Sequence, residues 1–144
     1  MVGSQNGRVL PGATIVEPAS TDASQTTVLV AVQSPRVREA LVAMLGALDG
    51  FQVVAEAETG EQALELARAY RPRLALVDQE LSGYGGWWTI HTLQTERLAK
   101  VIVALGRHGD GLNAQLAGAQ AYVQMGTPPR DLLHALVSAC SGCD

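Results

Sequence analysis

Short, mostly apolar segments that alternate with helical patterns constrain the fold of this chain more than any other feature. A strand that is apolar on both faces is typical of a parallel sheet covered by helices on both sides. The pattern therefore predicts an α/β domain with five strands, at Val28–Val32, Phe51–Ala57, Leu74–Val77, Val101–Leu105 and Ala121–Val123.

Helix start and stop signals separate the first three of these strands. Ser34-Pro35 predicts an N-cap followed by the first helical position, and Gly50 is suited to end that helix. Thr59 and Gln62 have the spacing of a capping box, and the second helix is expected to end before Pro72.

The later helices carry weaker signals. We expect helices over residues 86–97 and 111–118, and a final helix capped by Thr127-Pro128 that carries Leu132, Leu133, Leu136 and Val137. Five βα units with right-handed crossovers fit a flavodoxin-like, doubly wound sheet with strand order 2-1-3-4-5. In such sheets the functional crevice lies at the carboxyl ends of the strands.

Length and composition limit the classes of function. The chain has 144 residues, 47% of them apolar, and a net charge of −4, with no run of Lys or Arg. These values favour one domain, over residues 27–140, with tails at 1–26 and 141–144, and they argue against binding to nucleic acid or to an anionic membrane. No apolar run approaches the ~20 residues of a membrane span, and no signal peptide is evident, so we expect a cytoplasmic protein.

The thiols and imidazoles do not form a recognisable metal or redox site. Cys140 and Cys143 are spaced as C-x-x-C but lie past the expected end of the last helix, where the helix dipole disfavours a thiolate. Two cysteines do not fill the four positions of a zinc site, and the scattered His91, His108 and His134 have no metal-binding spacing. We therefore predict no metal ligands and a frayed C-terminal tail.

The strand ends hold only one charged side chain. Val32 and Gln33 follow the first strand, Asp78 follows the third, Leu105 closes the fourth and Met125 follows the fifth. If these ends meet at one edge of the sheet, Asp78 is the only candidate for charge-dependent chemistry there.

Three stretches resemble the receiver domains of two-component response regulators. They are VLVAVQSPRVREAL at Val28–Leu41, the more specific FQVVAEAETGEQALELARAYRPRLALVDQELSGYGG at Phe51–Gly86, and GAQAYVQMGTPPRDLLHAL at Gly118–Leu136. The resemblance covers roughly residues 27–140. It implies a flavodoxin-like fold and a role in phosphorelay signalling.

The same resemblance implies that most of the receiver chemistry is missing. The family's phosphoacceptor aspartate falls on Asp78, but its acidic pair falls on Val32 and Gln33, its switch hydroxyl on Leu105 and its lysine on Met125. The family's loop proline is replaced by Ser82.

These losses have direct physical consequences. Mg²⁺ seeks about six oxygen ligands, and Asp78 with a backbone carbonyl of Glu80 would make a poor site, so magnesium binding is expected to be weak or absent. Leu105 has no side-chain hydrogen-bond donor and Met125 has no positive charge, so neither side chain could bind a phosphoryl group on Asp78. We therefore interpret Asp78 as a vestigial or weak phosphoacceptor that is hydrogen-bonded to loop amides, and we assign no catalytic residue.

Trp87 and Trp88 follow the glycine-rich loop Gly83–Gly86. We expect both rings to pack in the core. The alternative is that one ring is exposed beside Asp78 and serves an interface.

The favoured function is an atypical, phosphorylation-independent receiver-like domain that acts by protein docking. Its partner would be a histidine kinase, an output protein or another regulator. The resemblance implies a homodimer through the fourth helix, fifth strand and fifth helix, roughly Asn113–Val137. Only eight residues follow Leu136, so we expect any output domain to belong to another chain.

Two alternatives stay open: a conventional receiver that uses Asp78, and a small-molecule sensor with a ligand in the emptied acidic pocket. An enzyme is the least expected class, because no nucleophile–base pair or metal cluster is evident.

Overall fold

The computed structural model describes residues 25–107 and 111–141. Most of the predicted N-terminal tail, the loop residues His108 and Asp110, and Cys143 lie outside these residues. The chain alternates strand and helix throughout, in the order β1 (Thr26–Ala31), α1 (Pro35–Gly46), β2 (Phe51–Ala57), α2 (Gly60–Tyr70), β3 (Leu74–Asp78), α3 (Gly86–Thr95), β4 (Val101–Gly106), α4 (Gly111–Ala117), β5 (Ala121–Gln124) and α5 (Pro129–Ser141).

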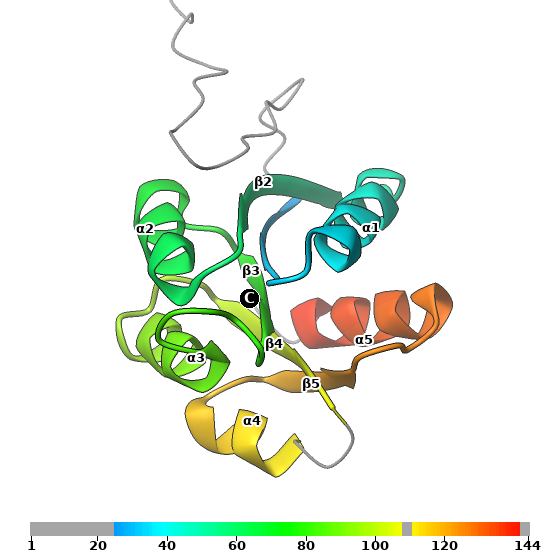
Figure 1. The fold of residues 1–144 in the computed structure, drawn as a ribbon. Helices are drawn as coiled ribbons and strands as arrows, with labels where there is room; N and C mark the ends of the chain where they lie inside the picture. The colour runs from blue at the N-terminus through cyan, green and yellow to red at the C-terminus, as the bar shows by residue number, and fades with distance from the viewer. Residues whose placement is uncertain (1–24, 108–110, 142–144) are drawn as a thin grey trace, which may run out of the picture.

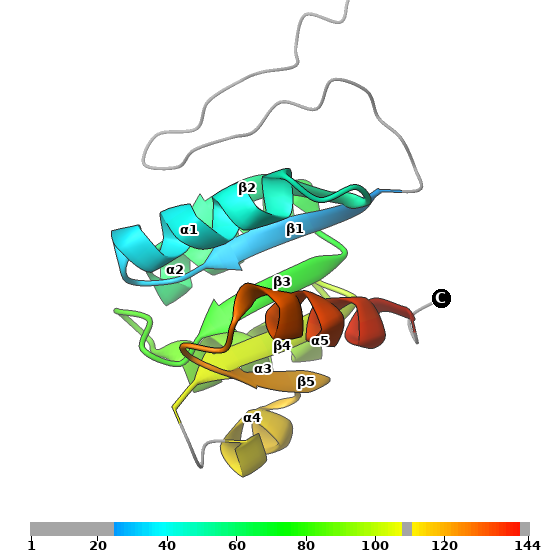
Figure 2. The same cartoon turned by 90° about the vertical axis from the view of Figure 1, so that its right-hand side faces the viewer.

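The five strands form one parallel sheet in the order β2-β1-β3-β4-β5, which confirms the predicted flavodoxin-like topology. Helices α1 and α5 cover one face of the sheet, α2 and α3 cover the other, and α4 lies beside the edge strand β5 (Figures 1 and 2). The carboxyl ends of β1, β3, β4 and β5 therefore reach the same edge of the sheet, where the sequence predicted the functional crevice.

Alternate residues of each central strand belong to two separate hydrophobic cores, one on each face of the sheet. In β1, Val28 and Val30 pack toward α1 and α5, whereas Leu29 and Ala31 pack toward α2 and α3. All four side chains are fully buried. Burial on both faces explains why the central strands are apolar without alternation.

Two helix starts follow the local signals in the sequence. The Ser34 side chain accepts a hydrogen bond from the Val37 backbone N–H at 3.3 Å. The Thr59 hydroxyl accepts one from the Gln62 backbone N–H at 3.1 Å. Each cap provides an acceptor for a backbone donor that the first turn of the helix leaves unpaired.

The prediction that Gly50 ends the first helix was wrong. Helix α1 ends at Gly46, and the N–H of Ala47 closes it on the Ala43 carbonyl at 3.2 Å. Gly50 lies instead in the turn into β2 with φ of 95°, and its carbonyl accepts the Thr26 N–H at 2.7 Å. Its positive φ serves the turn and not a helix end.

Two predictions at the C-terminus were also wrong. Thr127 does not cap α5, because its hydroxyl donates to the Gln124 carbonyl and the helix begins at Pro129. Cys140 is not in a frayed tail, since it lies in the last turn of α5 and packs half-buried against the core on that face.

Candidate functional site

Asp78 is the last residue of β3, in the centre of the sheet, and only 3% of its surface is exposed. Its Oδ1 accepts the backbone N–H of Glu80 at 2.9 Å, and its Oδ2 accepts that of Gln33 at 3.3 Å. Both carboxylate oxygens are thus engaged by amides of the two loops that flank the strand end. The predicted hydrogen bonds from loop amides are present, and the weak or vestigial character of Asp78 as a phosphoacceptor stays a prediction.

Burial raises the pKa of Asp78 above its ordinary value. The hydrogen bonds from Glu80 and Gln33 favour the carboxylate and oppose this shift, while the nearby Glu80 carboxylate adds to it. The charged form of Asp78 is therefore less stable here than on the protein surface.

The loop after Asp78 lies against the start of α3. A Cβ atom at Gly86 would stand 2.5 Å from the Asp78 carbonyl oxygen and would also collide with the Gln79 backbone. Only glycine allows this approach, because backbone atoms cannot give way as a flexible side chain does. The N–H of Gln79 also binds the Leu105 carbonyl at 2.9 Å, so the loop is tied to β4 as well.

The structure brings the other predicted site positions to the same edge of the sheet as Asp78. Val32 is fully buried, and its side chain belongs to the core cluster of the α1–α5 side. Gln33 has an exposed side chain, and it is its backbone N–H that reaches Asp78. Leu105 pairs with Asp78 in the β3–β4 register and is 2% exposed. None of these three side chains offers a charge to the site.

Two further predicted positions serve the backbone of the loops. Met125 is 36% exposed, and its N–H donates to the Gly106 carbonyl at 2.6 Å. The Ser82 carbonyl accepts the N–H of Gly60 at 3.0 Å, which joins the loop after β3 to the start of α2.

Arg38 is a site residue that the sequence reasoning missed. Its guanidinium donates to the Val32 carbonyl at 2.7 Å and to the Gln33 carbonyl at 3.5 Å. It also approaches the carboxylates of Glu56 at 3.5 Å and Glu58 at 3.6 Å. Arg38 therefore positions the β1–α1 loop whose amide binds Asp78. The signal would have been an arginine on α1 opposite Glu56 of β2 and Glu58 just after it, which becomes visible only once β2 is placed beside β1.

A second guanidinium lies on the outer side of the site. Arg107 forms an ion pair with Glu80 at 3.2 Å, and both side chains are largely in solvent, with 76% and 48% exposure. Such an exposed pair contributes little to stability. The pair nevertheless places the positive charge of Arg107 beside the Glu80 carboxylate, two residues after Asp78.

The described part of the chain contains no group of three or more His, Cys, Asp or Glu side chains that could hold a metal ion. Nor does any helix within it combine the length and apolar character that crossing a membrane requires.

The two tryptophans have different environments, so the expectation that both are core residues was wrong. Trp87 is half-buried and packs against the core on the α2–α3 side. Trp88 is 39% exposed, and its ring lies 4.1 Å from that of Tyr84, centroid to centroid. Their consecutive positions on α3 force this difference, because neighbouring helical residues point about 100° apart.

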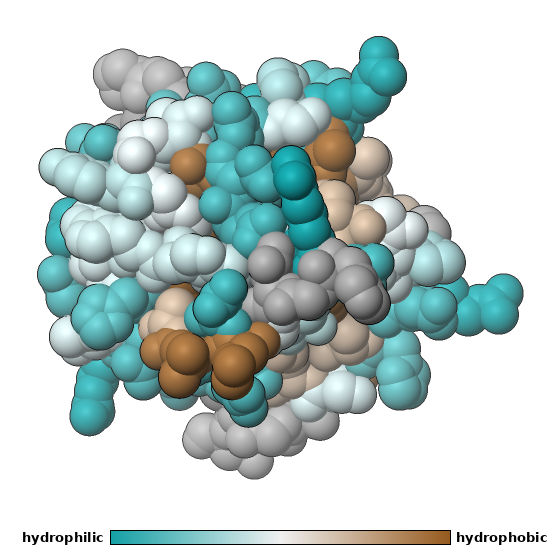
Figure 3. Space-filling view, turned by 60° about the horizontal axis from the view of Figure 1, so that its bottom comes forward, coloured by the Kyte–Doolittle hydropathy of each residue, from teal (hydrophilic) through white to brown (hydrophobic). Residues whose placement is uncertain are grey.

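A hollow of about 460 Å³ lies between α3 and α4. It is lined by Trp87, Trp88, His91, Asn113, Leu116 and Ala117. The outer surface of α4 beside it carries the exposed side chains of Leu112 and Leu116, and Figure 3 shows hydrophobic side chains gathered on this side of the molecule. The exposed ring of Trp88 therefore faces a helix–helix groove and not Asp78.

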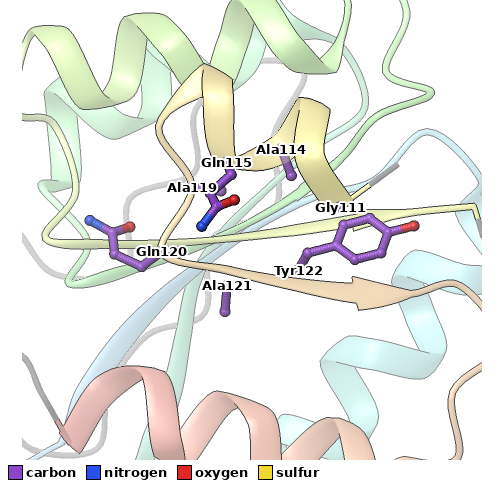
Figure 4. Close-up of a pocket in the computed structure, with 7 residues that line it drawn as sticks. All are labelled: Gly111, Ala114, Gln115, Ala119, Gln120, Ala121 and Tyr122. Atoms are coloured by element: carbon purple, nitrogen blue, oxygen red, sulfur yellow. The ribbon is translucent and has the colours of Figure 1, made fainter. Parts of the chain in front are cut away.

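A smaller cavity of about 160 Å³ separates α4 from β5 (Figure 4). Its walls are mainly small residues, with the ring of Tyr122 at one end, near Gly111. Ala114 is the only buried residue of α4. Helix α4 is thus attached to the sheet by a narrow contact. Tyr122 lies close to Gly106, where an added Cβ would stand 3.0 Å from the ring.

The fold and the central aspartate define a receiver-type α/β domain, and comparison with known proteins identifies the family. Residues 28–137 match the model of the response regulator receiver domain. The chain belongs to this family, and it is a receiver domain of two-component signalling.

Curated relatives support the assignment. The chain is 32% identical over 119 residues to the nitrate/nitrite response regulator protein NarL of Escherichia coli K12, with 81% of this chain and 55% of NarL covered. It is 32% identical over 118 residues to the response regulator GacA of Pseudomonas aeruginosa, with 80% and 55% covered. The chain thus spans about half the length of the curated relatives it matches. The prediction that it binds no nucleic acid stays a prediction.

Solved structures agree with the fold. The crystal structure of a LuxR-family two-component response regulator from Aurantimonas sp. SI85-9A1 superposes with a TM-score of 0.74 at 29% identity, covering 83% of this chain and 88% of that one.

Proposed function

We propose that this receiver domain works in the cytoplasm as a docking module whose signalling state does not depend on phosphorylation of Asp78. The observation that carries the proposal is the state of the Asp78 carboxylate. It is buried, both of its oxygens accept backbone amides, and burial disfavours its charge.

The donor set around Asp78 does not fit a magnesium ion. Mg²⁺ requires near-octahedral oxygen coordination and usually keeps one or two carboxylates as ligands. Val32 places two methyl groups in the core where a second carboxylate would be needed, and the Glu80 carboxylate is paired with Arg107. No step of the proposed function therefore passes through a bound metal.

The hydroxyl and the ammonium group that would bind a phosphoryl group are also lacking. Leu105 is a buried apolar side chain, and Met125 has neither charge nor a strong donor. A phosphoryl group on Asp78 would carry about two negative charges in place of the carboxylate's one, without a hydroxyl or ammonium to bind them. Signal transfer through a persistent surface, recognised by another protein, needs none of these groups.

Titration with magnesium and beryllofluoride, followed by amide NMR, tests the proposal. Beryllofluoride mimics a phosphoryl group on a carboxylate, so a working receiver would show saturable shifts at residues 101–106 and 121–125. We expect no saturable shift in wild type at millimolar magnesium. A matched Asp78→Asn sample identifies shifts caused by weak binding elsewhere.

A phosphodonor experiment tests directly whether Asp78 can be phosphorylated. Incubation with acetyl phosphate, followed by intact mass measurement, should leave the chain unmodified. A mass gain of one phosphoryl group that disappears in Asp78→Asn would contradict the proposal and assign a conventional phosphoacceptor role to Asp78.

The small-molecule alternative has less support. The two cavities described above lie on either side of α4, and neither is lined by Asp78.

A further inference from the structure

Exposed apolar side chains are concentrated on one face of the domain. Four large apolar residues with exposed surface lie on or beside α3 and α4: Tyr84 (59%), Trp88 (39%), Leu112 (66%) and Leu116 (75%). We propose that this α3–α4 face, made by these four residues and the hollow between the helices, binds a second copy of the same chain. The inference rests on the proposed docking function and names its partner.

The shape of the face suits pairing with itself. The hollow of about 460 Å³ has Trp88 and Leu116 on its walls, and Leu112 projects from α4 one turn away from Leu116. A two-fold contact places each projection of one copy against the corresponding hollow of the other. The α3–α4 face contains both the projecting side chains and the hollow.

The charge distribution favours a second copy over a partner selected by charge. Helix α3 (GWWTIHTLQT) and helix α4 (GLNAQLA) contain no Asp, Glu, Lys or Arg, although the chain as a whole has a net charge of −4. Two copies that meet through other, charged faces bring like charges together, which costs free energy. The α3–α4 face lets identical molecules approach without that repulsion.

Aromatic and aliphatic anchors give the face its binding energy. Trp and Tyr are enriched among residues that dominate interface affinity, and Tyr84 and Trp88 already hold each other in a tilted stack. Because the two rings are pre-positioned, little side-chain entropy remains to be lost on binding.

The size of the face sets the expected affinity. Ten residues of α3 extend for about 15 Å, and two packed helices with their side chains are about 20 Å wide. Even with the relief of the side chains, this is smaller than the roughly 800 Å² that each partner contributes to a standard stable interface. We therefore expect a weak, reversible dimer with a Kd on the order of 1–100 µM.

The inference differs from the dimer that the sequence predicted through α4, β5 and α5. Leu116 lines the hollow toward α3, and so the apolar surface of α4 continues onto Trp88 and not onto β5. Val137 is an exposed apolar residue of α5, in a helix that also exposes Arg130 and Asp131. The two faces share α4 and therefore Leu116, but Val137 of α5 belongs only to the predicted one, so the effect of substituting Val137 separates them.

Sedimentation velocity of the full chain, from about 1 to about 500 µM, tests the inference across the expected Kd range. Wild type should shift from monomer to dimer within this range. Leu116→Glu should weaken the dimer at least about tenfold, since it places a charge beside its symmetry mate. Val137→Glu is the control: Val137 is also an exposed apolar residue, at 48% against 75% for Leu116, and the dimer of this variant should match that of wild type. Circular dichroism confirms that both variants fold.

Two results would overturn the inference. One is a wild-type chain that stays monomeric at the highest concentration. The other is a dimer that Val137→Glu weakens, whether or not Leu116→Glu also weakens it, because Val137 lies only on the face through α5. Neither result bears on whether Asp78 responds to beryllofluoride, so failure of the inference and failure of the proposed function remain distinguishable.

Discussion

Replacing Arg38 with methionine should destabilise the domain through the loop that holds Asp78. Methionine keeps most of the unbranched stem and its packing but removes the guanidinium. The variant loses the 2.7 Å hydrogen bond to the Val32 carbonyl and the ion pairs with Glu56 and Glu58.

The expected loss follows from the burial of these partners. A hydrogen bond from a charged group contributes roughly 1.5–3 kcal/mol to stability. The pair with Glu56 is largely shielded from solvent, with 15% and 16% of the two side chains exposed, whereas Glu58 is 57% exposed and adds little. We expect the free energy of unfolding to fall by about 2–3 kcal/mol at neutral pH.

The loss should depend on pH. The pKa of Glu56 is raised by burial, and Arg38 is the main influence that lowers it. Removing Arg38 raises that pKa further. A carboxyl whose pKa is higher in the folded state than in the unfolded state costs stability when charged, and the cost disappears as the pH falls toward the ordinary glutamate value. Arg38→Met should therefore be most harmful near pH 7 and less harmful near pH 4.5, the ordinary Glu56 value.

Urea unfolding at both pH values measures this effect. Arg36→Met is the matched control, since Arg36 is exposed on the same helix, and it should change stability by less than about 0.5 kcal/mol. Adding Glu56→Gln to Arg38→Met should recover part of the loss at pH 7. If the Arg38 and Arg36 variants were equally stable, or if the Arg38 loss were the same at both pH values, the reasoning would be refuted.

Three other substitutions test the geometry around the site. Asp78→Asn should gain stability relative to wild type as the pH rises from 4 to 7, because the raised pKa of Asp78 makes its charged form costly; urea unfolding that shows no such trend would contradict this. Gly86→Ala should lower the free energy of unfolding by about 2 kcal/mol or more, as its Cβ meets backbone atoms, and a melting temperature close to wild type would be the contrary result. Gly106→Ala should displace the Tyr122 ring, which stands 3.0 Å from the added Cβ, and an unchanged near-UV circular dichroism spectrum would show that the ring had not moved.

The fold was predictable because its signals are local or periodic. The strands fall within a residue or two of the predicted segments, since residues buried on both faces must be apolar. Ser34 and Thr59 cap their helices as expected because each needs only its own backbone nearby. The predictions for Gly50 and Thr127 were wrong for a related reason. Glycine and threonine occur in turns as well as at helix ends, and the sequence does not show which of these two roles each residue has.

The site was predictable in part. Its members could be placed because carboxyl ends of parallel strands share an edge, and the structure does bring Val32, Asp78 and Leu105 there. Arg38 could not be recognised, because its contacts depend on β2 lying against α1. The exposure of Trp88 likewise depends on how α4 packs beside α3, which the weak sequence signal of α4 did not define.

The charges linked to the site support the proposal that this domain acts by docking and not through a phosphoryl group on Asp78. Asp78 is connected through the contacts above to three other carboxylates, those of Glu56, Glu58 and Glu80, and to the guanidiniums of Arg38 and Arg107. Both arginines are already paired with glutamates, so two negative charges in this network have no counterpart. Because Asp78 is buried and Glu56 is largely shielded from solvent, repulsion between like charges is strongest there, and a phosphoryl group on Asp78 would meet an unfavourable potential from the start. Under the proposed function a signal enters this domain where it carries no charge, and the proposed α3–α4 face is such a surface.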